Sequence, residues 1–323
     1  MYTARVSNPG LIWLDDEGAK RLIDEKSRAG EITPEEADNL RKFAVDGYFI
    51  TKVEVTAEDA AEIDRDVDRL WREKPSNVSF AYDSPPMRFS ASDEGAHRRP
   101  RYRIHELHCA SKVAERLTLD RQLHRYASLI LGEPAIATQS LYFEFGSQQM
   151  LHRDSTVVPT PEFGRLVAAW IALEDITEES GPLAYVPGSQ KFPFQSLHGD
   201  EDYVYDPSRH TASEVENAVR FYGDELQKSG LPTHHFLGKR GEVLVWHSAL
   251  MHGGAPPASP ERTRKSYVIH YSTLRDNRTR LCAVSEPVDG VPGESVFESD
   301  AILERDGVYA FGNPLEGRFL YRR

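Results

Sequence analysis

The feature that most constrains the fold is a series of short strand-like segments that begins near residue 135. These segments are rich in β-branched, aromatic and aliphatic residues, and they cover 135–145, 166–173, 183–186, 242–246 and 266–273. The stretch 166–173 is apolar almost without a break, which is typical of a strand buried on both faces. Many short strands separated by turns favour a sandwich or a barrel. The sequence therefore predicts a mainly β fold with flanking helices, and specifically a jelly roll.

Helices are predicted before and within this series. Thr33, Pro34 and Glu36 form a capping box that opens one helix, and Thr56 opens a second. The stretch 76–103 is rich in Ser, Pro, Gly and charge, which favours a functional loop. We expect one domain over 1–323. Its first part is a helical region, 1–132, with a lid loop at about 76–104 and a further helix over about 111–131. The core follows over 133–274, with an insertion at about 189–231 that holds a helix near 212–228. The last part is a C-terminal extension, 275–323.

Composition excludes several classes of protein. The formal net charge is −12, which argues against nucleic acid as a partner because phosphate binding needs clustered Lys and Arg. No apolar run is long enough to span a bilayer, so no membrane partner is expected. Only two cysteines are present, too few for a disulfide scaffold. With no secretory signal pattern at the start, the sequence predicts a cytoplasmic protein.

The segment His152-Arg153-Asp154 carries the first sign of chemistry. Residues two apart on a strand project to the same face, so an imidazole and a carboxylate here can chelate one divalent cation. His252 is the candidate third ligand, in the turn-like stretch between two predicted strands. Two histidines and one carboxylate leave three coordination positions open, an arrangement that suits non-haem Fe(II). Catalysis is therefore assigned to His152, Asp154 and His252.

Arg264 is the candidate for binding a carboxylate. A planar guanidinium grips a carboxylate with two parallel hydrogen bonds, as a dicarboxylate cosubstrate of an iron site requires at its far end. Arg264 opens the last predicted strand of the core. Arg262 is its rival, since both residues fall on the same alternation, and the spacing to the strand end favours Arg264.

With these residues in place, 33–274 resembles the phytanoyl-CoA dioxygenase family of Fe(II)/2-oxoglutarate oxygenases. The matching stretches are TPEEADNLRKFAVDGYFIT, GSQQMLHRDS, AAWIALEDITEESGPLAYVPGSQ and GEVLVWHSALMHGGAP, followed by RTRKSYVIHY. The resemblance implies a double-stranded β-helix core, cupin-like, with His152, Asp154 and His252 as iron ligands. It also implies Arg264 as the anchor for the distal carboxylate of 2-oxoglutarate. Leu151 stands where this family often has Trp, and Gln190 where a His is usual.

The resemblance also directs the choice of reaction. Related halogenases have Gly or Ala in place of the carboxylate ligand, whereas Asp154 is intact here. We therefore expect hydroxylation of a small-molecule substrate, with 2-oxoglutarate and O₂ converted to succinate and CO₂. The cofactors expected are Fe(II) and 2-oxoglutarate, and the sequence assigns neither the substrate nor an oligomeric state.

Further residues have weaker assignments. Gln139, Trp170 and Gln149 are expected to line the cosubstrate pocket, and Arg101, Arg103 and His105 to meet an anionic group on the substrate. Trp246, His247 and His270 are interpreted as packing or supporting residues. Two other functions stay open: a cupin-like metalloenzyme that does not use 2-oxoglutarate, and a non-catalytic jelly-roll module that binds a ligand.

Overall fold

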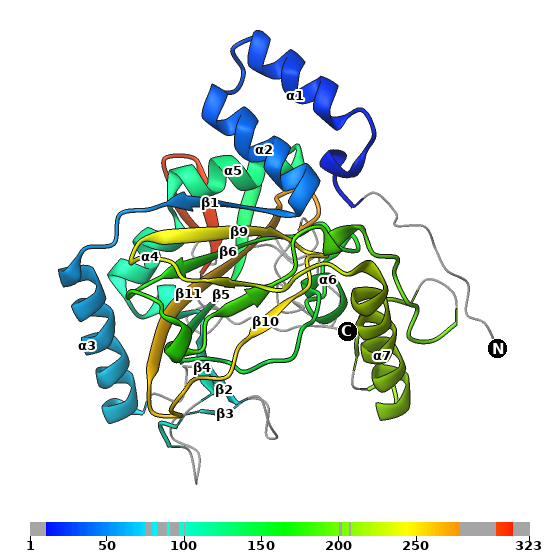
Figure 1. Ribbon diagram of the computed structural model, residues 1–323. Coiled ribbons are helices and arrows are strands. Elements are labelled where there is room, and N and C mark those ends of the chain that lie inside the picture. The colour runs from blue at the N-terminus through cyan, green and yellow to red at the C-terminus, as the bar shows by residue number, and fades with distance from the viewer. Residues whose placement is uncertain are drawn as a thin grey trace, which may run out of the picture.

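The computed structural model describes most of the chain. The described residues are 11–74, 79–82, 89–90, 97–99, 101–199, 202–206, 208–277 and 302–312. Within them, helices pack around two β-sheets (Figure 1). No helix in these ranges has both the length and the apolar character needed to cross a membrane.

Ten of the described strands form one large sheet, and three form a second, smaller one. The order in the large sheet is β1-β9-β6-β11-β5-β4-β2-β3, with β13 also paired to β5 and β12 to β13; the small sheet has the order β10-β7-β8. The strands are β1 Tyr48–Lys52, β2 Ser79–Tyr82, β3 Phe89–Ser90, β4 Tyr102–His105, β5 Ala135–Phe145, β6 Val167–Ala172, β7 Leu183–Tyr185, β8 His234–Phe236, β9 Glu242–His247, β10 His252–Gly254, β11 Thr263–Thr273, β12 Ile302–Arg305 and β13 Val308–Phe311. All five predicted strands are present, and the predicted jelly roll is confirmed.

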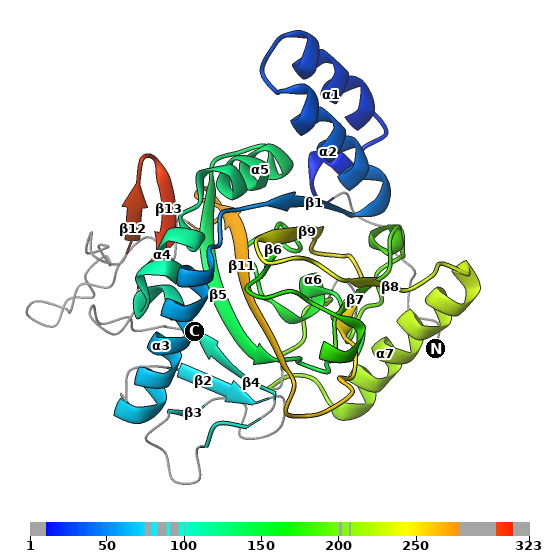
Figure 2. The same cartoon turned by 60° about the vertical axis from the view of Figure 1, so that its left-hand side comes forward.

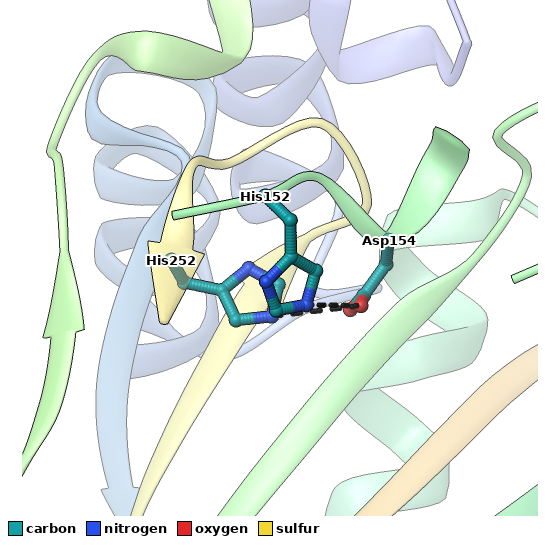
Figure 3. A group of neighbouring side chains, drawn as sticks. All are labelled: His152, Asp154 and His252. Carbon is teal, nitrogen blue, oxygen red and sulfur yellow. Dashed lines mark ion pairs between the residues drawn. The ribbon is translucent and has the colours of Figure 1, made fainter. Parts of the chain in front are cut away.

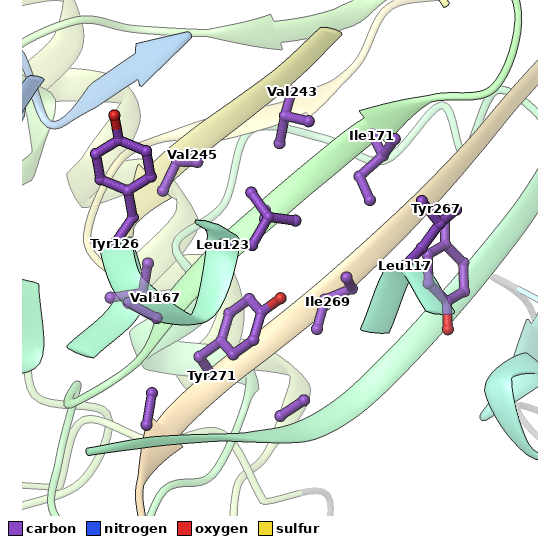
Figure 4. Packing of buried hydrophobic residues seen from close by; sticks show 14 of the residues in the cluster. Leu117, Leu123, Tyr126, Val167, Ile171, Val243, Val245, Tyr267, Ile269 and Tyr271 are labelled. Carbon is purple, nitrogen blue, oxygen red and sulfur yellow. The ribbon is translucent and has the colours of Figure 1, made fainter. Parts of the chain in front are cut away.

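The alternation along β6 explains why this strand is apolar throughout. Its odd-numbered residues, with those of β9 and β11, pack against the helices, as in Figure 4 for Val167 and Ile171. Its even-numbered residues, among them Trp170, pack toward the small sheet, where they meet Leu183 and Phe236. Both faces of β6 are therefore buried, as a sheet covered on both sides requires.

The helices begin and end at sequence signals. They are α1 Ala19–Arg28, α2 Pro34–Asp46, α3 Ala57–Glu73, α4 Lys112–Thr118, α5 Arg121–Leu131, α6 Asp154–Val157 and α7 Ala212–Ser229, with 3-10 turns η1 Trp13–Asp15, η2 Leu107–Cys109, η3 Glu178–Ser180 and η4 Ser189–Lys191. The capping box at Thr33 and the helix cap at Thr56 are present as predicted, and the cap at Thr56 is also a capping box. The single helix expected over 111–131 is instead two, because the Asp120 side chain caps a new helix by accepting from the backbone N–H of Leu123.

Two regions outside the core contain strands that no sequence pattern indicated. Most of the predicted lid loop, 76–104, lies outside the described residues, but its described parts include β2, β3 and β4, which extend the large sheet. Strands of two to four residues are too short to show a period in the sequence. Within the C-terminal extension, β12 and β13 form a hairpin beside β5 (Figure 2). The ring Nε2 of His108 lies 2.7 Å from the carbonyl oxygen of Phe311 and fixes this hairpin to η2.

Candidate metal centre

The backbone brings His152 and His252 together directly. His252 is the first residue of β10, and His152 joins it through a β-bridge with two hydrogen bonds of 2.9 and 3.0 Å. Asp154 lies on no strand, contrary to the prediction, because it begins the single turn of α6. Its side chain nevertheless points the same way as that of His152, since Arg153 between them is extended (φ −117°, ψ 132°).

Two glycines after His252 make this close approach possible. A Cβ on Gly253 would lie 2.6 Å from the carbonyl oxygen of Gln149, and a Cβ on Gly254 would lie 2.7 Å from the backbone nitrogen of Gln148. Backbone atoms cannot move aside to relieve such short contacts, whereas the end of a flexible side chain can. The segment before His152 can therefore lie against β10 only because these two positions carry no side chain.

Three donor atoms of His152, Asp154 and His252 converge on one point (Figure 3). The Oδ1 of Asp154 lies 3.5 Å from Nε2 of His252 and 3.8 Å from Nε2 of His152. One such atom from each of the three residues lies within 4.8 Å of the other two. A cation between them would be in reach of two nitrogens and one carboxylate oxygen.

The tautomers of both histidines follow from their backbone contacts. Nδ1 of His152 lies 2.9 Å from the carbonyl oxygen of Met150, and Nδ1 of His252 lies 3.0 Å from that of Leu250. A carbonyl oxygen only accepts, so Nδ1 carries the proton in each ring and the Nε2 lone pair faces Asp154. Burial and the neighbouring His252 lower the pKa of His152 to about 4, which keeps its ring neutral.

The carboxyl of Asp154 is held in its ionised form. Burial alone raises its pKa, but the nearby His252, His270 and His152 together bring the pKa below its ordinary value. Nε2 of both histidines and the Asp154 carboxylate thus face a common point. This donor set fits a divalent transition metal of the Fe(II) type.

Trp246 and His270, which the sequence predicted as packing or supporting residues, contact the Asp154 carboxylate. Trp246 on β9 donates from Nε1 to Oδ2 of Asp154 over 2.8 Å. His270 on β11 places Nε2 3.6 Å from the same oxygen, and its Nδ1 lies 3.1 Å from Oε1 of Gln139. A sequence signal existed: Trp246 shares its strand parity with Leu244, and His270 with Arg264, so both face the interior between the sheets.

Arg264 is one of the largest fully buried side chains, at 1% exposure. Its guanidinium lies 5.2 Å from the ring of Trp170 and 5.7 Å from that of Phe143. Within the described part of the chain no carboxylate lies within 4.0 Å of it, and its Nε has no hydrogen-bond partner. Burial lowers its pKa to about 10, with a partial opposing effect from Glu174. The rival Arg262 is exposed to solvent.

All seven residues assigned to the site line one cavity of about 1400 Å³: His152, Asp154, His252, Arg264, Gln139, Trp170 and Gln149. Leu141 and Phe143, which share a face of β5 with Gln139, line it as well. The structure therefore brings all seven of these residues to one cavity, although the roles of the individual residues remain predictions.

Arg153 points away from this cavity, into the insertion. Its guanidinium donates to the carbonyl oxygens of Ser189 and Phe192, at 2.8 and 3.0 Å, and lies 4.6 Å from the ring of Tyr222 on α7. The residue between the two metal-ligand candidates thus ties the insertion to the metal segment. Its side chain is almost fully buried.

Known structures of similar shape have the same fold. EctD from S. alaskensis with bound Fe superposes with a TM-score of 0.52 at 20% identity and covers 83% of this chain and 87% of that chain. The non-heme alpha ketoglutarate dependent carbocyclase SnoK from nogalamycin biosynthesis superposes with a TM-score of 0.53 at 17% identity and covers 83% and 98%. At these identities the likeness establishes the jelly-roll fold and nothing finer.

The chain also resembles known proteins in sequence. Phytanoyl-CoA dioxygenase domain-containing protein 1 of Mus musculus is 30% identical over 185 residues, which cover 51% of this chain and 55% of that protein. The protein of the same name from Bos taurus is 24% identical over 179 residues, with 51% and 55% covered. The chain thus spans little more than half the length of these relatives. The family profile described as Phytanoyl-CoA dioxygenase (PhyH) matches residues 43–266, well over half of the chain, and the chain belongs to this family.

Proposed function

We propose that this protein is an Fe(II)- and 2-oxoglutarate-dependent oxygenase that hydroxylates a small molecule. The observation that carries the proposal is the convergence of two imidazole nitrogens and the Asp154 carboxylate on one cavity with the buried Arg264, which has no carboxylate partner among the described residues. Membership of the PhyH family supports the same reaction class. The expected products from the cosubstrates 2-oxoglutarate and O₂ are succinate and CO₂.

The residues of the triad would hold Fe(II) through Nε2 of His152, Oδ1 of Asp154 and Nε2 of His252. The bound ion would supply the activation of O₂, coupled to oxidative decarboxylation of 2-oxoglutarate. The protein's own contribution is geometric, since Trp246 and the backbone carbonyls of Met150 and Leu250 fix the direction of each ligand atom. Groups that orient metal ligands in this way raise metal affinity.

Arg264 would bind the distal carboxylate of 2-oxoglutarate. A buried guanidinium without a carboxylate partner is costly, and an incoming carboxylate would offset that cost through two charge-assisted hydrogen bonds. Trp170 and Phe143 flank the guanidinium, so the cosubstrate would lie between aromatic walls with water excluded. Gln139 and Gln149, on the same cavity, would provide polar contacts to it.

Hydroxylation is the outcome that the ligand set favours. With Asp154 in place, the carboxylate would take the coordination position that an added halide would need. We therefore propose that the product is an alcohol rather than a halide.

The test compares the wild type with Asp154→Ala and with Asp175→Ala, a control that removes an aspartate with a 58% exposed side chain. Fe(II) and 2-oxoglutarate are titrated under argon and followed by the weak visible charge-transfer band, and succinate release is then screened against a metabolite library. We expect the band and succinate release in the wild type and the control, and neither in Asp154→Ala.

Other results would support the alternatives. A metal-binding protein that gives no band with 2-oxoglutarate and no succinate would be a metalloenzyme of another kind. A protein that binds neither metal nor 2-oxoglutarate would be a ligand-binding module. Undiminished succinate release by Asp154→Ala would contradict the ligand assignment.

A further inference from the structure

One side of the cavity carries charge opposite to that of the protein. The chain has a formal net charge of −12, yet Arg101, Arg103 and His105 all line the cavity. The carboxylates on the same lining are the metal-ligand candidate Asp154 and Glu106, whose Oε2 accepts from the backbone of Ser140. A cationic wall on an acidic protein is suited to recognising an anion.

Two of the four arginines in the basic run 97–103 line the cavity, and the other two contact side chains elsewhere. Arg98 is held in ion pairs by Glu144 and Asp68. Arg99 lies over the ring of Tyr82, 3.8 Å from its centre. Arg101 and Arg103 are the two arginines of the run that line the cavity.

Arg101 is held in an unusual backbone conformation. Its φ is 70°, and the φ of Gln148, whose Oε1 accepts from the Arg101 guanidinium over 2.5 Å, is 53°. Both are in the left-handed region that residues with a Cβ rarely adopt, and such strain is concentrated at functional sites. Among the described residues no carboxylate lies within 4.0 Å of this guanidinium, whose bonding partner is a neutral amide.

Arg103 lies on the same sheet face as Arg264. On β4 it is in register with Phe143 of β5, and paired residues on neighbouring strands point to the same side. The Arg264 guanidinium lies 5.7 Å from the ring of the same Phe143, and all three residues line the cavity. The cavity therefore has two cationic positions: the buried one at Arg264, and a second nearer the surface at Arg103 and Arg101.

Another part of the cavity lining is apolar. Met150 and Val157 are large hydrophobic residues with exposures of 67% and 44%, and both line the cavity. Val158, Pro159 and Pro161 continue the same lining. Ligand sites for drug-sized molecules measure about 300–1000 Å³, so a cavity of about 1400 Å³ has room for a sizeable substrate beside 2-oxoglutarate.

We propose that the substrate is an amphipathic small molecule with one anionic group. Arg101 and Arg103 bind that group, whether carboxylate, phosphate or sulfate, and the apolar body of the molecule lies against Met150 and the wall 157–161. This assignment rests on the proposed function, because it names the substrate class of the same site. Under this assignment, 2-oxoglutarate binds at Arg264 and the anionic group of the substrate binds at Arg101 and Arg103.

The experiment measures binding by calorimetry under argon, with the full chain loaded with Fe(II) and 2-oxoglutarate. The probes are aromatic and alicyclic carboxylates, phosphate monoesters and sulfates, each paired with its neutral methyl ester or parent alcohol. The variants are Arg101→Gln, Arg103→Gln and the double variant. Arg72→Gln is the control, since its side chain is 71% exposed on α3. The affinity for 2-oxoglutarate is measured separately in each protein.

We expect at least one anionic probe to bind the wild type and the control about tenfold or more tightly than its neutral partner, as one charge-assisted hydrogen bond provides. The double variant should lose that preference and keep its affinity for 2-oxoglutarate. The proposal is wrong if no anionic probe outbinds its partner, if the preference survives in the double variant, or if the double variant loses 2-oxoglutarate instead. Failure of the wild type to bind Fe(II) and 2-oxoglutarate would overturn the oxygenase assignment, a result that these titrations report separately.

Discussion

The indole Nε1 of Trp246 donates a 2.8 Å hydrogen bond to Oδ2 of Asp154. With one carboxylate oxygen engaged in this way, the other, Oδ1, faces Nε2 of His252 and of His152. The indole also packs against the second histidine, with 4.6 Å between the ring centres of Trp246 and His252. One tryptophan on β9 thereby sets the orientation of two of the three metal-ligand candidates.

Replacing Trp246 by Phe should weaken metal binding. The ring stays in place but the hydrogen bond to Asp154 is lost, and loss of such a contact typically lowers metal affinity about 10–100-fold. Competitive titration with a chromogenic chelator measures the change. Trp13→Phe is the matched control, because Nε1 of Trp13 also donates over 2.8 Å, to the carbonyl of Leu129 in α5. Equal metal affinity in the two variants would show that the Trp246 contact has no part in binding.

Replacing Arg264 by Met should stabilise the ligand-free protein and abolish its response to 2-oxoglutarate. Among the described residues the Nε of the buried guanidinium has no hydrogen-bond partner, and exchanging a poorly compensated buried charge for an apolar side chain can raise the free energy of unfolding by on the order of 1 kcal/mol or more. Thermal unfolding with Mn(II), with and without 2-oxoglutarate, measures both effects. In the wild type, 2-oxoglutarate should raise the melting temperature as a ligand of the native state does.

Arg262→Met is the control for this experiment. Arg262 is exposed and two residues from Arg264, so its loss should leave both the stability and the response to 2-oxoglutarate unchanged. If the response disappears in Arg262→Met and persists in Arg264→Met, the rival arginine is the anchor.

The sequence predicted what depends on short-range pattern. Strand alternation placed Gln139, Leu141 and Phe143 on one face, and all three line the cavity. The spacing of His152 and Asp154 predicted a shared direction although no strand forms there, because the one residue between them needs only to be extended. Capping signals likewise placed the start of α2, where the Thr33 side chain accepts from the N–H of Glu36.

Contacts across the sheets were not predictable in this way. Arg262 and Arg264 have the same parity, and burial distinguishes them only because β11 begins at Thr263. The roles of Trp246 and His270 depend on which oxygen of Asp154 each side chain contacts. That contact depends on the register of β9, β6 and β11. The hairpin of β12 and β13 pairs with β5 more than 150 residues earlier in the chain, a separation over which no local pattern is informative.

Gly253→Ala should separate the two histidines. The added Cβ would lie 2.6 Å from the carbonyl oxygen of Gln149, so the segment before His152 must move away from β10. We expect a loss of metal affinity together with a lower free energy of unfolding, measured by chelator competition and urea denaturation.

Gly223→Ala is the counterpart, since a Cβ at Gly223 in α7 meets no atom of the described residues within 4 Å. Alanine in a helix interior is favoured over glycine by roughly 1 kcal/mol, so this variant should be more stable and bind metal normally. Normal metal affinity in Gly253→Ala would mean that the bridge tolerates the extra atom.

Buried His124 should make the protein less stable in mild acid. Burial lowers its pKa from 6.5 to about 4, against a smaller opposing effect from its contact with the carbonyl of Thr118, 3.1 Å away. The unfolded chain therefore takes up a proton below about pH 6.5, and the folded protein does so only near pH 4. Stability is lost as the pH falls through 6.5, and this group alone lowers the free energy of unfolding by about 2 kcal/mol between pH 7.5 and pH 5.

Urea denaturation at the two pH values, in the wild type and in His124→Gln, measures this contribution. The glutamine amide does not titrate, so the decrease in the free energy of unfolding on acidification should be smaller in the variant by about the same 2 kcal/mol. His198→Gln is the control, because that ring has a 73% exposed side chain and its replacement should leave most of the pH dependence in place. An unchanged pH dependence in His124→Gln would show that the His124 ring is protonated in the folded protein as readily as in the unfolded chain.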